Sequence, residues 1–103
     1  MLSDLSALAG CSKLKTINLN ACKKVCDIGP LAGCSSLESL NIGACSNVLD
    51  ISPLAGCDLL QNLNLKACDG LRDISALAKC SKLVALDVSN CANVKSFTFT
   101  TQT

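Results

Sequence analysis

The apolar residues of this chain recur with a period of 23 positions. Segment 27–34 reads Asp-Ile-Gly-Pro-Leu-Ala-Gly-Cys, and segment 50–57 reads Asp-Ile-Ser-Pro-Leu-Ala-Gly-Cys. Segments 4–11 and 73–80 show the same pattern in the same phase. Internal similarity at a fixed period of about 20–50 residues is typical of solenoids and other repeat architectures. The chain is therefore predicted to contain four copies of one unit, running from about Asp4 to Lys95.

Each copy combines two kinds of periodicity. Eight of its positions stay apolar or Cys, and the run Leu37-x-x-Leu40-x-Ile42-x-x-Cys45 alternates at its centre, which predicts a short strand. The other half predicts a short α- or 3-10 helix. We expect Ser52 to be its N-cap and Pro53 its first helical residue. Each unit is thus predicted to be strand, turn, short helix and turn.

The pattern Leu-x-x-Leu-x-Leu-x-x-Cys resembles the leucine-rich repeat, whose last position accepts Asn or Cys. Segment 50–54 is similar to the short repeats of phosphatase-regulatory subunits and bacterial internalins, and the Cys positions are similar to those of F-box proteins. Regular arrays of this mixed kind also resemble kinetoplastid leucine-rich repeat proteins. The resemblance implies an α/β fold, a right-handed leucine-rich repeat solenoid over residues 1–97 with a tail at 98–103. It implies short parallel β-strands on the concave face and short α or 3-10 helices on the convex face.

The strand residues that do not point into the core would line the concave face. Their central column is Asn18, Asn41, Asn64 and Asp87, at a spacing of about 4.8 Å. One interpretation is a polar recognition strip whose amides donate and accept hydrogen bonds, and the other is an Asn ladder in which each amide bonds to its neighbour. Gly43 is small and would leave room for a protruding partner, as would Ala85. The residues predicted to contact a partner protein are Asn18, Asn20, Ser39, Asn41, Asn62, Asn64, Lys66 and Asp87.

An aspartate precedes each predicted helix, at positions 4, 27, 50 and 73. Stacked carboxylates could bind Ca²⁺ together with further oxygen ligands. The alternative is turn chemistry, in which each carboxylate accepts local backbone N–H bonds. We favour turn chemistry because the column follows the helix-start signal.

Nine cysteines occur in 103 residues, and eight of them fall into two columns. Free Cys is commonly buried, so a core role is expected. A column with a spacing of about 4.8 Å fits neither disulfide geometry nor a tetrahedral zinc site. Cys26 alone is off the pattern and is predicted to be the most exposed thiol. The nearby Lys23 and Lys24 would favour its thiolate, which leaves a redox role open beside that of an incidental surface thiol.

Composition narrows the chemistry further. The chain has no His, Trp or Tyr, one Arg, and a formal net charge of +1. Without imidazole there is no Ser-His or Cys-His nucleophile system and no histidine general base. We therefore expect no catalytic, cofactor or metal site, and neither nucleic acid nor a membrane as a partner. The odd cysteine count and the absence of a signal-peptide pattern favour a reducing, cytoplasmic location.

The expected function is a non-catalytic protein-protein interaction module that binds a partner on its concave sheet. Two alternatives stay open: a regulatory subunit that modulates a partner enzyme, and a structural fragment of a longer leucine-rich repeat array. The chain begins within a repeat at Leu2, which predicts an uncapped end and self-association through it. At the other end, Phe97 and Phe99 are predicted to cover the last repeat.

Overall fold

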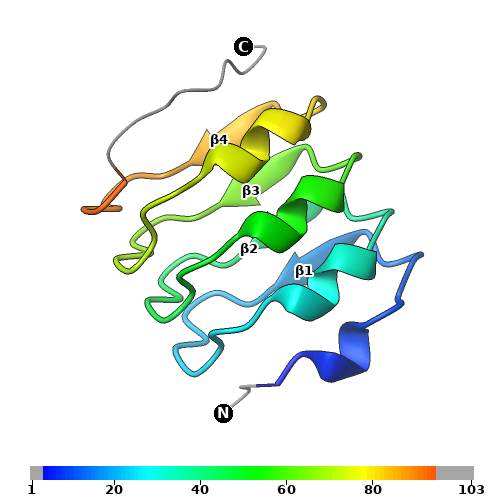
Figure 1. Ribbon diagram of the computed structural model, residues 1–103, viewed down its shortest axis with the longest axis horizontal. Coiled ribbons are helices and arrows are strands. Elements are labelled where there is room, and N and C mark those ends of the chain that lie inside the picture. The colour runs from blue at the N-terminus through cyan, green and yellow to red at the C-terminus, as the bar shows by residue number, and fades with distance from the viewer. Residues whose placement is uncertain (1–3, 95–103) are drawn as a thin grey trace.

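The structure, a computed structural model, describes residues 4–94 as four stacked coils of 23 residues. Each coil contributes one 3-10 helix and one short strand (Figure 1). The predicted tail at 98–103 and the two terminal Phe residues lie outside the described part. The strands are β1 (Thr16–Asn18), β2 (Ser39–Asn41), β3 (Asn62–Asn64) and β4 (Ala85–Asp87), and the helices are η1 (Ser6–Leu8), η2 (Gly29–Gly33), η3 (Ser52–Gly56) and η4 (Ser75–Lys79).

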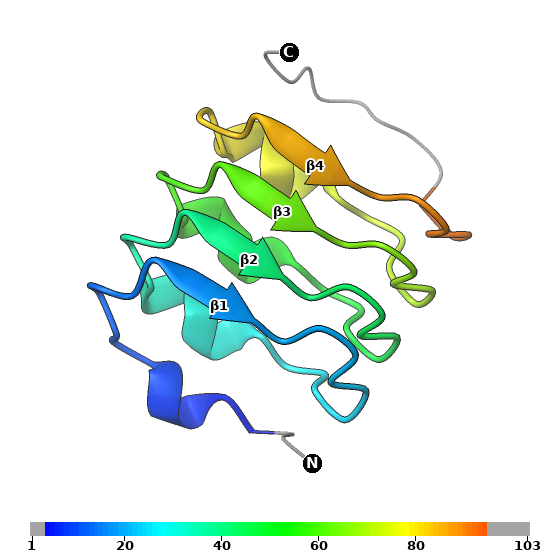
Figure 2. The ribbon, with the colours of Figure 1, turned by 180° about the vertical axis from the view of Figure 1, so that it is seen from behind.

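The four strands form one parallel sheet in the order β1-β2-β3-β4. The register is shifted by 23 residues at each step, so Ile17 pairs with Leu40 and Leu63 pairs with Leu86. Figure 2 shows the strands side by side on one face, and the helices lie behind them. The backbone ladder continues past the strands, since Ala21 N–H donates to the carbonyl of Gly43 at 2.7 Å. Each coil is thus bonded to the next along its whole sheet side.

The core lies between the sheet and the helices and is filled by the eight repeated apolar columns. In the middle coils these side chains are fully buried, as Leu37 and Leu60 are. In the first coil Leu14 is only partly buried, and so is Leu86 in the last. A coil therefore obtains its burial from its two neighbours, which is the nearest-neighbour packing of a solenoid.

Each helix begins with an aspartate turn. The Asp50 carboxylate accepts a hydrogen bond from Ser52 N–H at 2.8 Å, and the aspartates at positions 4, 27 and 73 make the same bond two residues on. The turn interpretation of this column is confirmed. The prediction that Ser52 is the N-cap is wrong, because Ile51 holds that position and Ser52 is the first helical residue. Its N–H is satisfied by the carboxylate two residues earlier.

A second turn follows each strand and has a left-handed backbone. Its central residue has a positive φ in every coil, at Ala21 (61°), Ala44 (59°), Ala67 (60°) and Asn90 (60°). This conformation costs roughly 1–2 kcal/mol for an L-residue other than Gly, and Asn tolerates it better than Ala does. The turn positions the next residue, a cysteine, so that its side chain points into the core.

The two cysteine columns join successive coils. In the strand-side column, Cys45 and Cys68 donate their thiol hydrogens to the carbonyls of Leu19 and Ile42, each at 3.1 Å in the preceding coil. In the helix-side column, Cys80 donates to the carbonyl of Leu54 at 3.4 Å. The predicted core role of the columns is confirmed, and the thiols also bond each coil to the one before it.

Candidate binding surface on the sheet

The polar residues predicted as contacts all lie on one side of the sheet, which we call the sheet face. The strand register places Asn18, Asn41, Asn64 and Asp87 in a single row across β1–β4. The other four predicted residues flank this row, and three of them are exposed, Ser39 being half-buried. The structure therefore brings all eight together: Asn18, Asn20, Ser39, Asn41, Asn62, Asn64, Lys66 and Asp87.

The side-chain oxygens of the central row are bonded to their own turns. Asn18 Oδ1 accepts from Asn20 N–H at 3.0 Å, and Asn41 Oδ1 accepts from Gly43 N–H at 2.9 Å. The row members of β3 and β4 do the same with the residue two positions later, at 2.8 and 2.9 Å. A backbone N–H bonds only to the oxygen of a carboxamide, so these bonds settle the orientation of each amide group.

The interpretation that each amide of this row bonds to its neighbour in a ladder is wrong. No described residue of the row bonds laterally to another member, since each oxygen turns to its own backbone. The one lateral amide bond comes from outside the row, where Asn20 Nδ2 donates to Asn41 Oδ1 at 3.3 Å. Sequence reasoning missed this local bonding, although the Asn-x-Asn and Asp-x-Ser spacings are compatible with Asx turns.

Gly43 does not leave the room expected of it. It is buried, and a Cβ atom at this position would lie 2.9 Å from Asn20 Nδ2 and 3.1 Å from the Oδ1 atoms of Asn41 and Asn64. The three carboxamides therefore close over this glycine. Ala85, the other small residue, is exposed as predicted.

Charge on the sheet face gathers at its β3–β4 end. The Ser89 hydroxyl and N–H both donate to Asp87 Oδ1, at 2.6 and 2.9 Å, and they lower the pKa of Asp87, with a smaller contribution from the positive charge of Lys66. Asp87 is therefore ionised over the whole physiological range. The row is neutral over β1–β3 and anionic at β4.

Thiol chemistry is separate from the sheet face. Cys26 is the one exposed cysteine, as predicted, and all nine thiols are free. Burial raises the pKa of Cys57 and Cys68 to about 11, from an ordinary value of 9.0. Cys57 and Cys68 are therefore un-ionised and unreactive near neutral pH.

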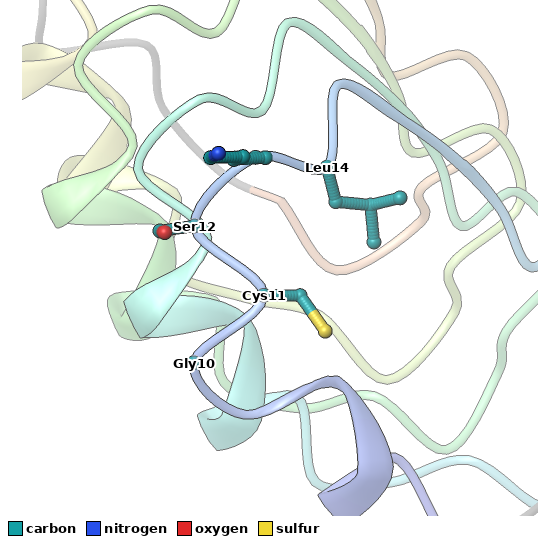
Figure 3. A pocket seen from close by; sticks show the side chains of 5 residues that line it. Gly10, Cys11, Ser12 and Leu14 are labelled. Carbon is teal, nitrogen blue, oxygen red and sulfur yellow. The ribbon is translucent and has the colours of Figure 1, made fainter.

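A shallow hollow lies at the N-terminal end of the solenoid, away from the sheet face. It has a volume of about 510 Å³ and is lined by the segment from Gly10 to Leu14 (Figure 3). Its lining offers one half-buried thiol, Cys11, the hydroxyl of Ser12, the ammonium of Lys13 and the apolar side chain of Leu14.

Residues 4–94 contain no cluster of three or more His, Cys, Asp or Glu side chains arranged to hold a metal ion. In the same range, no helix has the length and hydropathy needed to cross a bilayer.

Among solved structures, an internalin (InlF) from Listeria monocytogenes is similar to this chain, with 30% sequence identity and a TM-score of 0.73 over 82% of the chain. The chain spans 24% of the length of that internalin. Internalin C2 from the same organism matches at 26% identity and a TM-score of 0.48, over 96% of this chain and 57% of its own. No protein-family model matches the sequence, and no curated protein is significantly similar to it. The similarity to the first internalin confirms the expected leucine-rich repeat solenoid.

Proposed function

Because the chain has the leucine-rich repeat fold, which is typically a protein-binding module, we propose that its sheet face binds a partner protein. One observation carries the proposal. Eight polar side chains from four successive coils lie together on one continuous surface, and turn bonds orient the central row before any partner arrives. Pre-oriented groups lose less conformational entropy on binding than free ones.

The surface suits specificity better than high affinity. It offers amides, hydroxyls and one ion of each sign, and its predicted contacts include no aromatic or Arg side chain of the kind that forms binding hot spots. We therefore expect a dissociation constant in the micromolar range or weaker. The proposed role is non-catalytic, because the sequence has no His to act as the general base that activates a hydroxyl or thiol nucleophile.

The experiment is a pull-down from an extract of the producing organism under reducing conditions. The native chain is compared with an Asn41→Arg/Asn64→Arg variant, which places two long cations in the central row. The matched control is Ala32→Arg/Ala78→Arg, which adds the same two side chains at exposed positions of η2 and η4. Circular dichroism and thermal melting first establish that all three proteins are equally folded.

The proposal expects a partner that the native chain and the helix-side control retain and that the sheet-face variant loses. A partner lost only in the helix-side control would place binding on the opposite face and refute the proposal. Equal recovery with all three proteins would also refute it, because two arginines in the central row cannot leave a contact made there unchanged.

We also propose that the protein works in a reducing compartment. Cys45, Cys68 and Cys80 use their thiol hydrogens to bond neighbouring coils, and oxidation to a disulfide would remove those donors. Thiol titration of the freshly isolated native protein in denaturant tests this. Nine titratable thiols are expected, and a substantially lower count would contradict the proposal.

A further inference from the structure

In the central row of the sheet face, the amide oxygens of the first three strands are hydrogen-bonded within the described part of the protein and the amide nitrogens are not. The oxygens of Asn18, Asn41 and Asn64 all accept backbone N–H bonds. Asn41 Oδ1 accepts a second bond, from Asn20 Nδ2. Amide groups usually offer a donor and an acceptor together, but here each oxygen already accepts at least one bond.

The nitrogen atoms of these three amides are available. A carboxamide is planar, so Nδ2 lies on the side of the group away from the turn that holds Oδ1. No described residue accepts a hydrogen bond from Nδ2 of Asn18, Asn41 or Asn64. Each NH₂ group carries two N–H donors, which gives a row of six donor hydrogens on exposed or half-buried side chains.

Spacing and charge define what such a row would accept. Neighbouring strands lie about 4.8 Å apart, so the three amides span about 9.6 Å. An α-helix rises about 1.5 Å per residue, so its positions i, i+4 and i+7 span about 10.5 Å along one face. Side chains on an extended strand repeat on one face only every 6.6–6.8 Å or so, which matches the row less well. Lys66 lies beside the row and adds a positive charge, whereas Asp87 restricts an anion to β1–β3.

We propose that the donor row of Asn18, Asn41 and Asn64 recognises an acidic helix, one that presents carboxylates at positions i, i+4 and i+7. This proposal rests on the sheet face being the binding surface and adds the chemistry of the partner. The helix lies across the strands, and each carboxylate accepts N–H bonds from one amide. Charge-assisted bonds of this type are stronger than neutral ones and compensate in part for the absence of aromatic anchors.

The probe is a synthetic alanine-based helix of about 20 residues, long enough to be helical alone, with Glu at i, i+4 and i+7. Two matched peptides carry Lys at the same positions, or the same Glu residues with a central Pro that breaks the helix. The full chain is labelled with ¹⁵N, and the side-chain NH₂ resonances are followed during titration. These resonances report on the proposed donor atoms directly.

The chain itself supplies conservative variants. Asp87 occupies the row in the fourth coil and makes the same turn bond, so Asn→Asp is compatible with this position. The Asn18→Asp/Asn41→Asp/Asn64→Asp variant keeps the turn bonds and replaces all six donors by acceptors. Asp87→Asn instead extends the donor row to β4. Urea unfolding of both variants checks that any change in binding does not come from lost stability.

We expect the acidic helix to shift the NH₂ resonances of the three asparagines, and the triple variant to weaken binding by about tenfold or more. Asp87→Asn should strengthen it by about two- to fivefold, as expected for removing one exposed like charge. Equal binding of the Lys helix or of the Pro-broken peptide would overturn the proposal. Resonance shifts confined to residues of the helices η1–η4 would also overturn it. Absence of any binding would overturn it too, while the arginine variants in the pull-down still decide independently whether the sheet face binds a protein.

Discussion

Ala67 lies in the left-handed turn that follows β3, and its replacement by glycine should not destabilise the fold. Ala67 has φ 60°, where an L-residue with a Cβ atom pays roughly 1–2 kcal/mol that glycine does not pay. Replacing it by Gly removes this strain. The same change costs about 0.5–1 kcal/mol because glycine gains more freedom in the unfolded chain. The backbone bond from residue 67 to the carbonyl of Ser89, at 2.9 Å, does not depend on the side chain.

A matched substitution isolates the strain. Ala55 lies in η3 with a negative φ and is half-buried, as Ala67 is. Ala55→Gly therefore loses a comparable methyl group and pays the same entropy, with no strain to relieve. We expect Ala67→Gly to be neutral or stabilising by up to about 1 kcal/mol and Ala55→Gly to destabilise by about 0.5–1 kcal/mol. The difference between the two, about 1–2 kcal/mol, is the strain itself.

Urea unfolding followed by circular dichroism measures this difference, with equal m-values required for the comparison. In thermal melts the two variants should differ by about 4–16 °C, at about 4–8 °C per kcal/mol for a domain of this size. Ala67→Val is the opposite control, because a β-branched residue fits this conformation worst, and it should destabilise strongly. Equal free energies of unfolding for the two glycine variants would refute the reasoning.

Four further predictions concern the bonds between and within coils. Cys68→Ala removes a buried thiol and its bond to Ile42, so it should lower the free energy of unfolding in urea by about 1–3 kcal/mol. Cys22→Ala, at a half-exposed site, should lower it by less than about 1 kcal/mol. Equal losses for the two variants would contradict this prediction. Burial raises the pKa of Cys57 and Cys68 to about 11 from 9.0, so the un-ionised thiols contribute their full stabilisation below pH 9. The urea concentration at the unfolding midpoint should therefore decrease as the pH rises from 9 to about 11. A midpoint that does not change over this pH range would count against buried thiols. Gly43→Ala forces a methyl group against three carboxamides, so it should lower the free energy of unfolding by about 1–2 kcal/mol and shift the NH₂ resonances of Asn20 and Asn41. Unchanged resonances would show that these carboxamides do not cover the glycine. Asp50→Ala removes the bond to Ser52 N–H and should cost about 0.5–2 kcal/mol, whereas Asp58→Ala, at an exposed site outside the aspartate column, should cost less than about 0.5 kcal/mol.

Much of the fold follows from the period of the apolar residues. Because the eight columns match in every copy, successive strands must pair at an offset of 23 residues, and the register of Leu40 with Leu63 has that offset. The 3-10 character of the helices was one of two predicted forms, and their short length suits the tighter form; η2 and η3 also carry a proline near the start. Pattern therefore predicts which side chains are inside and where the sheet lies.

The local hydrogen bonds were harder to predict from the sequence than the fold. Ser52 is a residue type that commonly caps helices, but Asp50 also supplies a side-chain oxygen. Residue type alone does not show which of the two accepts the N–H bond at the start of the helix. Alanine carries no signal for a left-handed turn, and only Asn90 in the fourth copy hints at one. The coil geometry forces this backbone on whichever residue stands there.

The eight residues of the sheet face were predicted from the alternation of each strand together with the leucine-rich repeat resemblance, but the hydrogen bonding of their side chains was not. Sequence shows an amide at positions 18, 41 and 64 without showing which of its atoms is used. The Asx bonds occupy part of the acceptor capacity of these oxygens and leave the nitrogens without a partner among the described residues. Gly43 was misjudged for a related reason, since the space above it is filled by side chains from two neighbouring coils.

The central claim is that a partner protein sits on the sheet face, and site-specific photo-crosslinking tests it most directly. A benzophenone side chain is placed at Asn62, exposed in β3, or at Ala78, exposed in η4, of the otherwise native chain. After irradiation with the captured partner, the account predicts a covalent adduct from position 62 and none from position 78. An adduct from position 78 with none from position 62 would contradict it.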